Sequence, residues 1–540
     1  MRILTNDEVR QAAKEATGRA QVSAQALMQR AGYAVTQFCA SHFKFSSVCV
    51  VCGKGQNGGE GMAAAEALQV IVGQVSVIIL ARGASELSAD AADMCSNLSS
   101  EPIWIGDEAD FENAAARDAL AADLIVDAVA GAGDRLPLAA LERKAVEAMN
   151  GAFGAVVSVD LPSGVDGDST TPVHEKSEDV VFAHAIITFV APKPAHVFGE
   201  LTSGPIAVSE IGVQPALVAN ETDLEVVTGQ EVGITFPPRA DEAHKGQFGH
   251  VLMIAGSRGK AGAAGLAGMA ALRAGAGLVT VACPRSIQAT VASLAAELMT
   301  EELRETEEGA VAVEAAEKAD ALLRGKDVVV LGPGLSNNEQ TAEFVRRFVA
   351  GCPLPLVLDA DGLNAFAGHY NELKQRGEAA PFRVLTPHPG EAARLTGAGI
   401  GAIQADRLGT ARRMARETGS CVVLKGWRTV VAGASGETWL NMTGNPAMAK
   451  GGSGDVLSGI IGAALARRAE ESAGAAGKDS TFLNDLRVAA AVHLHGLAGD
   501  IARDALHENA VLATDLLGNL AEAFRECELQ MNRGLFYLRK

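Results

Sequence analysis

Short, almost purely apolar runs alternate along the chain with longer alanine-rich stretches in which apolar residues recur at helical spacing. Such runs, which lack polar alternation, are typical of parallel strands buried on both faces. The predicted strands are residues 48–53, 75–80, 124–129 and 155–160, followed by 251–256, 278–283, 327–332, 356–361 and 421–426. The pattern therefore predicts two layered α/β domains, each with a sheet between helices.

The pattern is interrupted between Gly212 and Ala243, where the segment VTGQEVGITFPPRADEA contains two adjacent prolines. A chain of 540 residues also exceeds the roughly 250 to 300 residues at which a single core stops growing. We therefore expect domains at residues 1–220 and 226–540, with the boundary near residue 225. A second irregular segment, residues 470–487, is rich in glycine, serine and charge and is predicted to be an exposed loop.

Charge narrows the range of partners. Lys and Arg number 46 against 65 Asp and Glu, a net charge of −19, and no basic cluster offers a footprint for nucleic acid or an anionic membrane. No apolar run reaches the roughly 20 residues of a membrane span. The N-terminus carries charges where a secretion signal needs apolar residues. We therefore expect a cytoplasmic protein that acts on small molecules, without nucleic acid or membrane partners. We also expect a homo-oligomer, although these features do not fix the oligomeric state.

A glycine-rich turn follows the first predicted strand, in the sequence GKGQNGGEGMAAAEAL, and opens an alanine-rich helix. Glycine lets backbone amides approach a ligand, and a helix N-terminus favours phosphate or a polar oxygen. Taken alone, such a turn can also be purely structural.

Polar side chains follow the next strand ends. Asp127 lies in the run at 124–129, ahead of a second glycine turn, and Asp160 and Ser163 come at the end of the run at 155–160. A single aspartate at such a place is often a helix cap. Ligands of open parallel sheets bind outside the carboxyl ends of the strands, so these polar strand ends together predict one binding crevice.

The strings QNGGEG, DAVAGAG, DLPSG and FVAPKPAH resemble the motifs of NAD(P)H-hydrate epimerases, over residues 1–215. The resemblance implies a Rossmann-like domain that interconverts the R and S hydrates of NADH and NADPH. The ligands that it implies for a potassium ion are Asn57, Asp127 and Ser163. The substrate contacts that it implies are Gln56, Asn57, Gly58, Gly59, Glu60, Gly131, Ala132, Gly133, Asp134, Arg135, Leu136, Pro137 and Asp160.

In this resemblance Asp160 matches the acid/base group, and Lys193 lies where it can assist. Inverting the carbinolamine at C6 of the hydrated ring requires only proton transfers to and from its hydroxyl. Gln56 and Glu60 depart from the usual Asn and Asp of the first motif but keep the type of hydrogen bond. The arginine in GAGDRLP is also shifted from its usual place.

The most specific stretch of the second half is NPAMAKGGSGDVLSGIIGAALA, in which a glycine run precedes an apolar helix. Consecutive amides of Gly452 to Gly454 can form a nest for a transferring phosphoryl group. Asp455 beside it can accept the proton of an attacking hydroxyl, which is the minimum machinery for phosphoryl transfer to an alcohol. The alternative is that Asp455 only caps the helix.

The string GGSGD resembles the anion-hole motif of ribokinase-like enzymes. Together with LGPGL, LVLDADGLN, LTPHPGEAARL and VVLKGWRTVV, it makes residues 226–520 resemble ADP-dependent NAD(P)H-hydrate dehydratases. The hydrate contacts that the resemblance implies are Ala263, Gly334, His388 and Asp455. The implied nucleotide contacts are Lys425, Gly426, Trp427, Arg428, Thr429, Gly452, Ser453 and Gly454. The implied metal is Mg²⁺, carried with ADP largely by phosphate oxygens. Lys450 stands where the family often has threonine and adds a cation near the phosphates.

Cysteine and histidine spacing does not support a zinc site. Cys49 and Cys52 form a CxxC, but they lie in the first predicted strand with no second Cys or His pair nearby, so we expect buried strand residues. His493 and His495 are two apart in a helical pattern, and we assign them to packing. His388 lies between two prolines that stiffen its loop, which favours a place in the site over a structural one.

The sequence thus predicts a repair enzyme for hydrated NADH and NADPH. One domain interconverts the R and S epimers, and the other uses ADP to dehydrate the S epimer, giving AMP and phosphate. One alternative is a ribokinase-like small-molecule kinase with an N-terminal regulatory binding domain, which GGSGD alone would allow but the epimerase-like half disfavours. A non-catalytic scaffold is the other, and the presence of both Asp160 and Asp455 argues against it.

Overall fold

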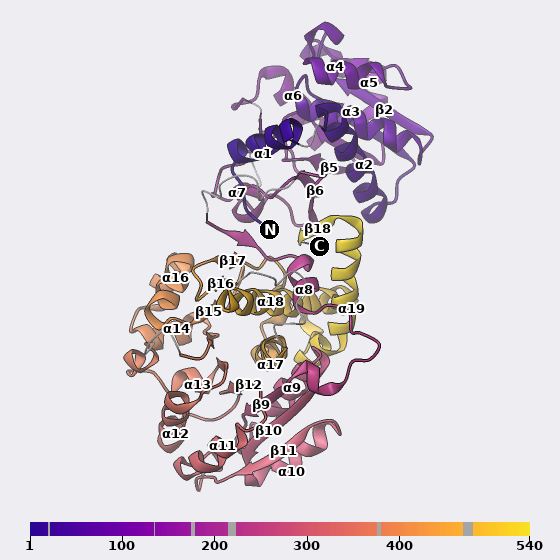
Figure 1. The fold of residues 1–540 in the computed structure, drawn as a ribbon. Coiled ribbons are helices and arrows are strands. Elements are labelled where there is room, and N and C mark those ends of the chain that lie inside the picture. The colour runs from indigo at the N-terminus through magenta and orange to yellow at the C-terminus, as the bar shows by residue number, and fades with distance from the viewer. Residues whose placement is uncertain are drawn as a thin grey trace. The chain divides into compact units, whose positions relative to one another are not determined.

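The computed structural model describes residues 1–19, 22–133, 135–173, 179–213, 223–374, 380–467 and 479–539. The chain divides into two compact units (Figure 1). The first comprises Met1–Asp223 together with Arg533–Lys540, and the second comprises Leu224–Asn532. Each unit packs helices against one sheet, so the predicted α/β class is confirmed.

The described residues of the first unit form a sheet of eight strands in the order β18-β7-β6-β5-β4-β1-β2-β3. Neighbouring strands are parallel except for β18, which runs antiparallel to β7. The strands are β1 (Ser47–Cys52), β2 (Gln74–Ile79), β3 (Ile103–Trp104), β4 (Leu124–Ala128), β5 (Ala155–Val159), β6 (Ala185–Phe189), β7 (Ile206–Ser209) and β18 (Leu535–Arg539). The helices are α1 (Asn6–Arg19), α2 (Ala24–His42), α3 (Gln56–Gln69), α4 (Ala89–Ser96), α5 (Ala114–Leu120), α6 (Ala140–Asn150) and α7 (Pro194–Phe198).

Both faces of this sheet are buried, which explains the unbroken apolar runs. Along β1, Val48, Val50 and Cys52 pack into an apolar cluster with α2 and α3, whereas Cys49 and Val51 pack into a second cluster with α5 and α6. Both cysteines are buried and free, as expected for strand residues. Burial raises the pKa of Cys49 to about 12, so this thiol is not available as a thiolate near neutral pH.

The described residues of the second unit form a sheet of ten strands in the order β11-β10-β9-β12-β13-β14-β15-β16-β17-β8. Its pairs are parallel except for β15 with β16 and β16 with β17. The strands are β8 (Glu225–Val226), β9 (His250–Ile254), β10 (Leu278–Pro284), β11 (Met299–Leu303), β12 (Val328–Leu331), β13 (Leu356–Leu358), β14 (Arg383–Leu385), β15 (Cys421–Leu424), β16 (Val430–Ala432) and β17 (Thr438–Leu440).

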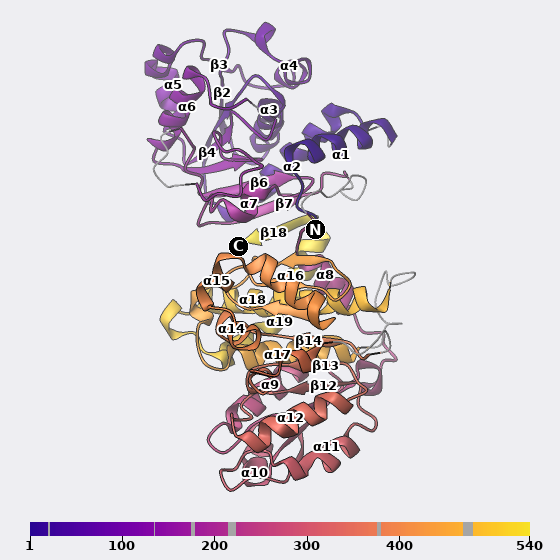
Figure 2. The same ribbon diagram turned by 90° about the vertical axis from the view of Figure 1, so that its left-hand side faces the viewer.

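The helices of the second unit are α8 (Gly229–Thr235), α9 (Ala261–Arg273), α10 (Arg285–Leu294), α11 (Ala316–Leu322), α12 (Glu339–Gly351), α13 (Asp361–Asn364), α14 (Pro389–Thr396), α15 (Ile400–Ala405), α16 (Arg407–Thr418), α17 (Ser453–Ala466), α18 (Ser480–Ala505) and α19 (Ala513–Arg533). Helix α17 packs against both α9 and α18 (Figure 2). A Cβ at Gly459 of α17 would lie 2.1 Å from the carbonyl oxygen of Ala267 in α9, so glycine permits this close approach. The packing fixes where α17 begins.

All nine predicted strands are present, but three other expectations need correction. The C-terminal residues, which we assigned to the second domain, contribute β18 to the sheet of the first unit, because the apolar sequence LFYL is buried beside β7. The interrupted segment near residue 225 contains β8 and α8, while residues 214–222 lie outside the described residues. In the predicted loop, residues 480–487 begin α18, and residues 470–478 lie outside the described residues.

None of the described helices combines the length and apolarity needed to cross a membrane.

Candidate active sites

The glycine-rich turn of the first unit begins α3 at the carboxyl end of β1. Asn57, Gly58, Gly59 and Glu60 are buried in its first turn. A Cβ at Gly58 would lie 2.0 Å from the carbonyl oxygen of Gly53, so only glycine lets the helix start this close to the strand end. Gln56 is the first residue of α3, and its Nε2 donates a hydrogen bond to Glu60 Oε1 at 3.1 Å. The two residues that depart from the family pattern therefore contact each other.

Asp127 is fully buried at the end of β4 and accepts hydrogen bonds from two neighbouring segments. Ser158 Oγ donates to Oδ2 at 2.8 Å, and Ser163 donates from its Oγ to Oδ1 at 2.5 Å and from its backbone N–H to Oδ2 at 2.9 Å. Burial raises the pKa of Asp127, although the hydrogen bonds from Ser163 and Ser158 oppose that rise. The structure thus brings two of the three predicted potassium ligands into direct contact.

Asn57, the third predicted ligand, is buried, with neither its side-chain oxygen nor its nitrogen paired within the described residues. A Cβ at Gly131 would lie 3.1 Å from both Asn57 Cγ and Asp160 Oδ2, so Asn57 and Asp160 flank the same glycine. A buried amide left unpaired costs about 1 to 3 kcal/mol. An orphaned buried oxygen of this kind is what a hard cation or a substrate hydroxyl would satisfy.

Asp160 follows β5 in a left-handed backbone conformation, with φ of +67°. Its carboxylate accepts hydrogen bonds from Lys193 Nζ, from Thr188 Oγ1 at 2.8 Å and from the backbone N–H of Ala132 at 2.9 Å. Burial alone would raise the pKa of Asp160, but the charge and hydrogen bond of Lys193 lower it to about 2. Asp160 is therefore a carboxylate at neutral pH and can accept a proton.

The sequence assigned no role to Thr188 or His196, although both contact this carboxylate or its backbone. Thr188 Oγ1 also accepts a hydrogen bond from Lys193 Nζ at 2.8 Å. His196 Nε2 lies 2.7 Å from the carbonyl oxygen of Asp160. The string FVAPKPAH places His196 three residues after Lys193 at a helix start, which is the one signal that could have identified it.

In the second unit the glycine run begins α17, with Gly452 at φ of +94° as its N-cap and Asp455 in the first turn. His495 of α18 lies with Nε2 2.9 Å from the carbonyl oxygen of Ser453, so this histidine contacts the glycine run as well as packing in the core. A Cβ at Gly454 would lie 3.5 Å from Lys425 Nζ, which puts an ammonium beside the backbone of the helix start. Amides and a cation together favour a phosphate.

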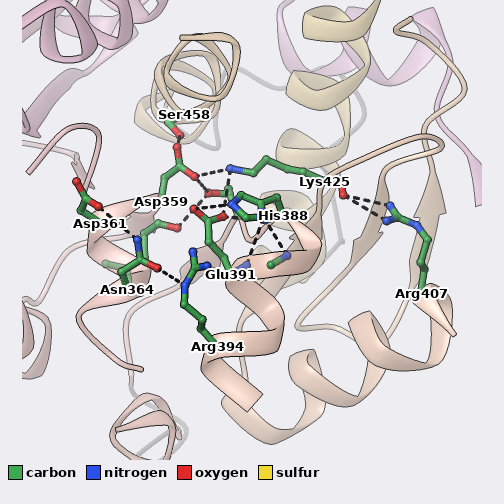
Figure 3. Close-up of polar contacts among 12 residues, drawn as sticks. Asp359, Asp361, Asn364, His388, Glu391, Arg394, Arg407, Lys425 and Ser458 are labelled. Carbon is green, nitrogen blue, oxygen red and sulfur yellow. Dashed lines mark hydrogen bonds and ion pairs between the residues drawn. The ribbon is translucent and has the colours of Figure 1, made fainter. Parts of the chain in front are cut away.

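Asp359, at the end of β13, connects this helix start to Lys425 (Figure 3). It is buried and accepts hydrogen bonds from Lys425 Nζ, from Thr386 Oγ1 and from Ser458 Oγ, each at 2.7 Å. Burial raises the pKa of Asp455 to about 6, helped by the negative charge of Asp359. Asp455 is therefore largely ionised at neutral pH and can accept a proton from a nearby hydroxyl.

His388 is the N-cap of α14, and its ring nitrogens have distinct partners (Figure 3). Nδ1 accepts from the backbone N–H groups of Gly390 at 3.0 Å and Glu391 at 3.3 Å. The proton of the neutral ring is therefore on Nε2, which lies 3.5 Å from Glu391 Oε1. Burial lowers the pKa of His388, and the half-exposed side chain leaves the ring accessible to a ligand.

The other predicted contacts of this site come from the first turn of α9, which contains Ala263, and from the loops that contain Gly334, Trp427 and Lys450. Ala263 and Gly334 are neighbours, because a Cβ at Gly334 would lie 2.9 Å from that of Ala263. Trp427 is 66% exposed, and the Arg428 guanidinium stacks 3.9 Å from its ring centre. Lys450, which we expect near the phosphates, donates to the carbonyl oxygen of Asn509 at 2.6 Å.

Part of the loop that is predicted to contact the epimerase substrate lies outside the described residues. Asp134 lies outside the described residues, whereas Gly133, Arg135, Leu136 and Pro137 form an exposed part of the loop that begins at Gly131. Within the described ranges, no group of three His, Cys, Asp or Glu side chains could hold a metal ion.

Comparisons with known proteins match both units. A family model described as NAD(P)H-hydrate dehydratase matches residues 251–522, and one described as YjeF-related protein N-terminus matches residues 24–195. The chain is 36% identical over 538 residues to a bifunctional NAD(P)H-hydrate repair enzyme of Moorella thermoacetica, covering 98% of this chain and 97% of the relative. It is 32% identical over 520 residues to the enzyme of that description from Escherichia coli, covering 95% and 92%. A solved ADP/ATP-dependent NAD(P)H-hydrate dehydratase from Bacillus subtilis shares 30% identity, with a TM-score of 0.47 over 56% of this chain and 98% of that one.

Proposed function

This chain belongs to the family of bifunctional NAD(P)H-hydrate repair enzymes, with an epimerase domain and a dehydratase domain, and we propose which of its residues carry each activity. The observation that carries the proposal is the contrast between two aspartates, the buried Asp160 and the partly buried Asp455, whose pKa values are shifted in opposite directions. Asp160 is held ionised beside Lys193, and Asp455 has a pKa of about 6 beside a glycine run. We propose that the boundary between the two domains along the chain lies near residue 225, and that residues 533–540 belong to the first domain.

In the epimerase site, Asp160 accepts the hydroxyl proton of the C6 carbinolamine, so that the C6–N1 bond opens to an aldehyde and N1 takes up a proton. Reclosure on the opposite face of C6 returns the proton to oxygen and gives the other epimer. Lys193, paired with Asp160, offsets the negative charge of the carboxylate. The turn at Gln56–Glu60 and the loop from Gly131 to Pro137 hold the substrate beside this pair.

A potassium ion fits the residues of this site. Asn57 offers an unpaired buried amide oxygen, and Asp127 and Ser163 supply further oxygens, which suit a hard cation. When bound, the ion would offset the negative charge of Asp127 and reduce the electrostatic repulsion between the site and the anionic substrate. Asn57, Asp127 and Ser163 are thus proposed as its ligands.

In the dehydratase site, Asp455 accepts the proton of the C6 hydroxyl as its oxygen attacks the terminal phosphorus of ADP, with AMP as the leaving group. Loss of the phosphate from C6 and of a proton from C5 then restores the C5=C6 double bond of NAD(P)H. Lys425 and the amides at Gly452–Gly454 hold the transferring phosphate. The loop from Lys425 to Thr429 holds the nucleotide, while Ala263, Gly334 and His388 contact the hydrate.

Mg²⁺ would enter this site with ADP, held mostly by phosphate oxygens, and would offset their charge during transfer. The residues beside the helix start fit that arrangement. The Asp359 carboxylate already accepts hydrogen bonds from Lys425, Thr386 and Ser458, so most ligands of the ion would be phosphate oxygens. The small-molecule partners are then the hydrates and ADP. A homo-oligomer in the cytoplasm remains a prediction, to be tested by light scattering and by cell fractionation.

The test supplies the full chain with hydrated NADH, ADP and Mg²⁺ and follows dihydronicotinamide absorbance together with AMP. The proposal expects one AMP and one phosphate for each NADH restored. A ribokinase-like kinase would consume nucleotide without restoring absorbance. A scaffold would do neither.

A further inference from the structure

The backbone of Asp160 adopts a conformation that few residues other than glycine take. Its φ of +67° lies in the left-handed region, where an L side chain is strained. This conformation turns the carboxylate toward Lys193 and the N–H of Ala132. Some contact must therefore hold the peptide after Asp160 in place, because strain of this kind persists only where its surroundings impose it.

His196 makes that contact. Its Nε2 lies 2.7 Å from the carbonyl oxygen of Asp160, and its Nδ1 accepts a hydrogen bond from the backbone N–H of Lys193 at 3.0 Å. Because Nδ1 is an acceptor, the proton of the neutral ring is on Nε2 and is donated to Asp160. The side chain is 1% exposed, and burial lowers its pKa to about 4, so the ring stays neutral at physiological pH.

One imidazole thus binds the backbones of two residues that are 33 positions apart in the chain and whose side chains form the central ion pair of the site. Both ring nitrogens bond to backbone atoms rather than to the carboxylate or the ammonium. Thr188 Oγ1 hydrogen-bonds to both charged groups. The ring and this hydroxyl leave the ion pair little freedom to separate.

We propose that His196 is a positioning residue of the epimerase reaction, which holds Asp160 and Lys193 in the geometry that proton transfer requires. The proposal rests on the role assigned above to Asp160. The competing explanation is that His196 only caps α7, because its Nδ1 also completes the first turn of that helix. The two explanations concern different ring nitrogens, so substitutions can separate them.

Asparagine and glutamine each replace one of these nitrogens. His196→Asn places an amide oxygen where Nδ1 lies and can keep the bond to the N–H of Lys193, but it has no group at the position of Nε2. His196→Gln carries an amide nitrogen far enough along the side chain to donate to the Asp160 carbonyl. His196→Ala removes both contacts.

The experiment uses the full chain and measures both activities of each variant. Dehydration of the S epimer takes place in the other unit and controls for enzyme concentration, whereas the melting temperature of the epimerase unit controls for its folding. We expect His196→Ala and His196→Asn to lower the kcat of epimerisation by roughly 10- to 100-fold with KM changed by less than about twofold, since a misplaced catalytic group costs rate rather than affinity. His196→Gln should recover most of the lost kcat.

Wild-type epimerisation in His196→Asn would overturn the proposal, because that variant keeps only the helix cap. A loss in His196→Gln as large as in His196→Ala would also overturn it. Asp160→Ala, measured in parallel, tests the proposed function separately: if that variant still epimerises at the wild-type rate, the role of Asp160 itself is wrong.

Discussion

Asp160 and Asp455 have the same side chain, and their surroundings push their pKa values in opposite directions. Lys193 overcomes the effect of burial at Asp160 and holds its pKa near 2, whereas burial and the charge of Asp359 raise that of Asp455 to about 6. Pairs of titratable groups that are separated in this way mark acid/base assignments. Each aspartate is thereby suited to a different reaction.

The pKa of Asp455 predicts the pH dependence of dehydration. Asp455 accepts a proton only when ionised, so kcat should rise with pH through a midpoint near 6. Asp359→Asn removes a negative charge and frees Lys425 to attract Asp455, so the midpoint should move to lower pH while the KM for ADP rises. The midpoints are measured from the pH dependence of dehydration kcat in the wild-type chain and in Asp359→Asn. The KM for ADP is measured for the same two proteins.

Asp485→Asn is the matched control, because Asp485 is equally buried but binds the turn at Ala434 and Ser435, away from the glycine run. Its profile should keep the wild-type midpoint. An unshifted midpoint in Asp359→Asn would show that Asp359 does not influence Asp455.

The buried oxygens of Asn57, Asp127 and Ser163 predict a potassium-dependent epimerase. Asp127→Ala should weaken substrate binding several-fold and remove the activation by potassium, because it removes the charged member of the ligand set. Epimerase KM is measured in potassium and in tetramethylammonium chloride at equal ionic strength. If the wild-type enzyme works equally well in both salts, the site does not hold the ion.

Asp127, Asp160 and Asp455 could be identified from sequence because each lies beside a glycine-rich turn close to a strand end or a helix start. His196 and Asp359 could not be identified in this way. Their partners, Asp160 and Lys425, are 36 and 66 positions away in the chain, and only the folded sheet brings them together.

The strand β18 shows how an element of one unit can be encoded far along the chain. Leu535, Phe536, Tyr537 and Leu538 are buried, and Tyr537 contacts the ring of His42 at 5.3 Å between ring centres. The sequence predicted nine strands from their apolar runs, but it did not predict β6, which is also buried along its length. It missed β18, because only four apolar residues follow a helix in a segment that sequence order assigns to the second domain.

Removing β18 should therefore damage the first unit and spare the second. A chain that ends at residue 532 exposes the edge of β7, and burial of one large apolar side chain contributes about 1.5 to 3 kcal/mol. We expect this truncation to lower the melting temperature of the epimerase unit and its activity, with dehydration of the S epimer retained. A fragment of residues 224–532 should show the same dehydratase activity alone.

Equal epimerase stability with and without residues 533–540 would show that β18 adds nothing to the sheet. Leu535→Ala combined with Phe536→Ala offers a milder version in the intact chain. This double variant should lower the melting temperature of the epimerase unit by less than the truncation does.

Across the whole molecule, buried neutral histidines make stability sensitive to acid. Burial lowers the pKa values of His196, His493 and His495 to about 4, whereas an unfolded histidine titrates near 6.5. Between these values the unfolded chain binds more protons, so stability is lost as pH falls from about 6.5 to about 4. Each residue contributes on the order of 3 kcal/mol to this loss. Melting temperatures across this range should fall, less steeply in His493→Gln.

The central claim is that one chain holds two independent reactions, with Asp160 needed for one and Asp455 for the other. The most direct measurement gives a mixture of R and S hydrates of NADH, with excess ADP and Mg²⁺, to the wild-type chain, Asp160→Ala and Asp455→Asn, and follows the return of NADH absorbance. The wild-type chain should restore all of the NADH, Asp160→Ala should stop once the S fraction is consumed apart from slow spontaneous epimerisation, and Asp455→Asn should lose roughly 100- to 10,000-fold in rate. Complete recovery by Asp160→Ala at the wild-type rate, or undiminished turnover by Asp455→Asn, would contradict the account.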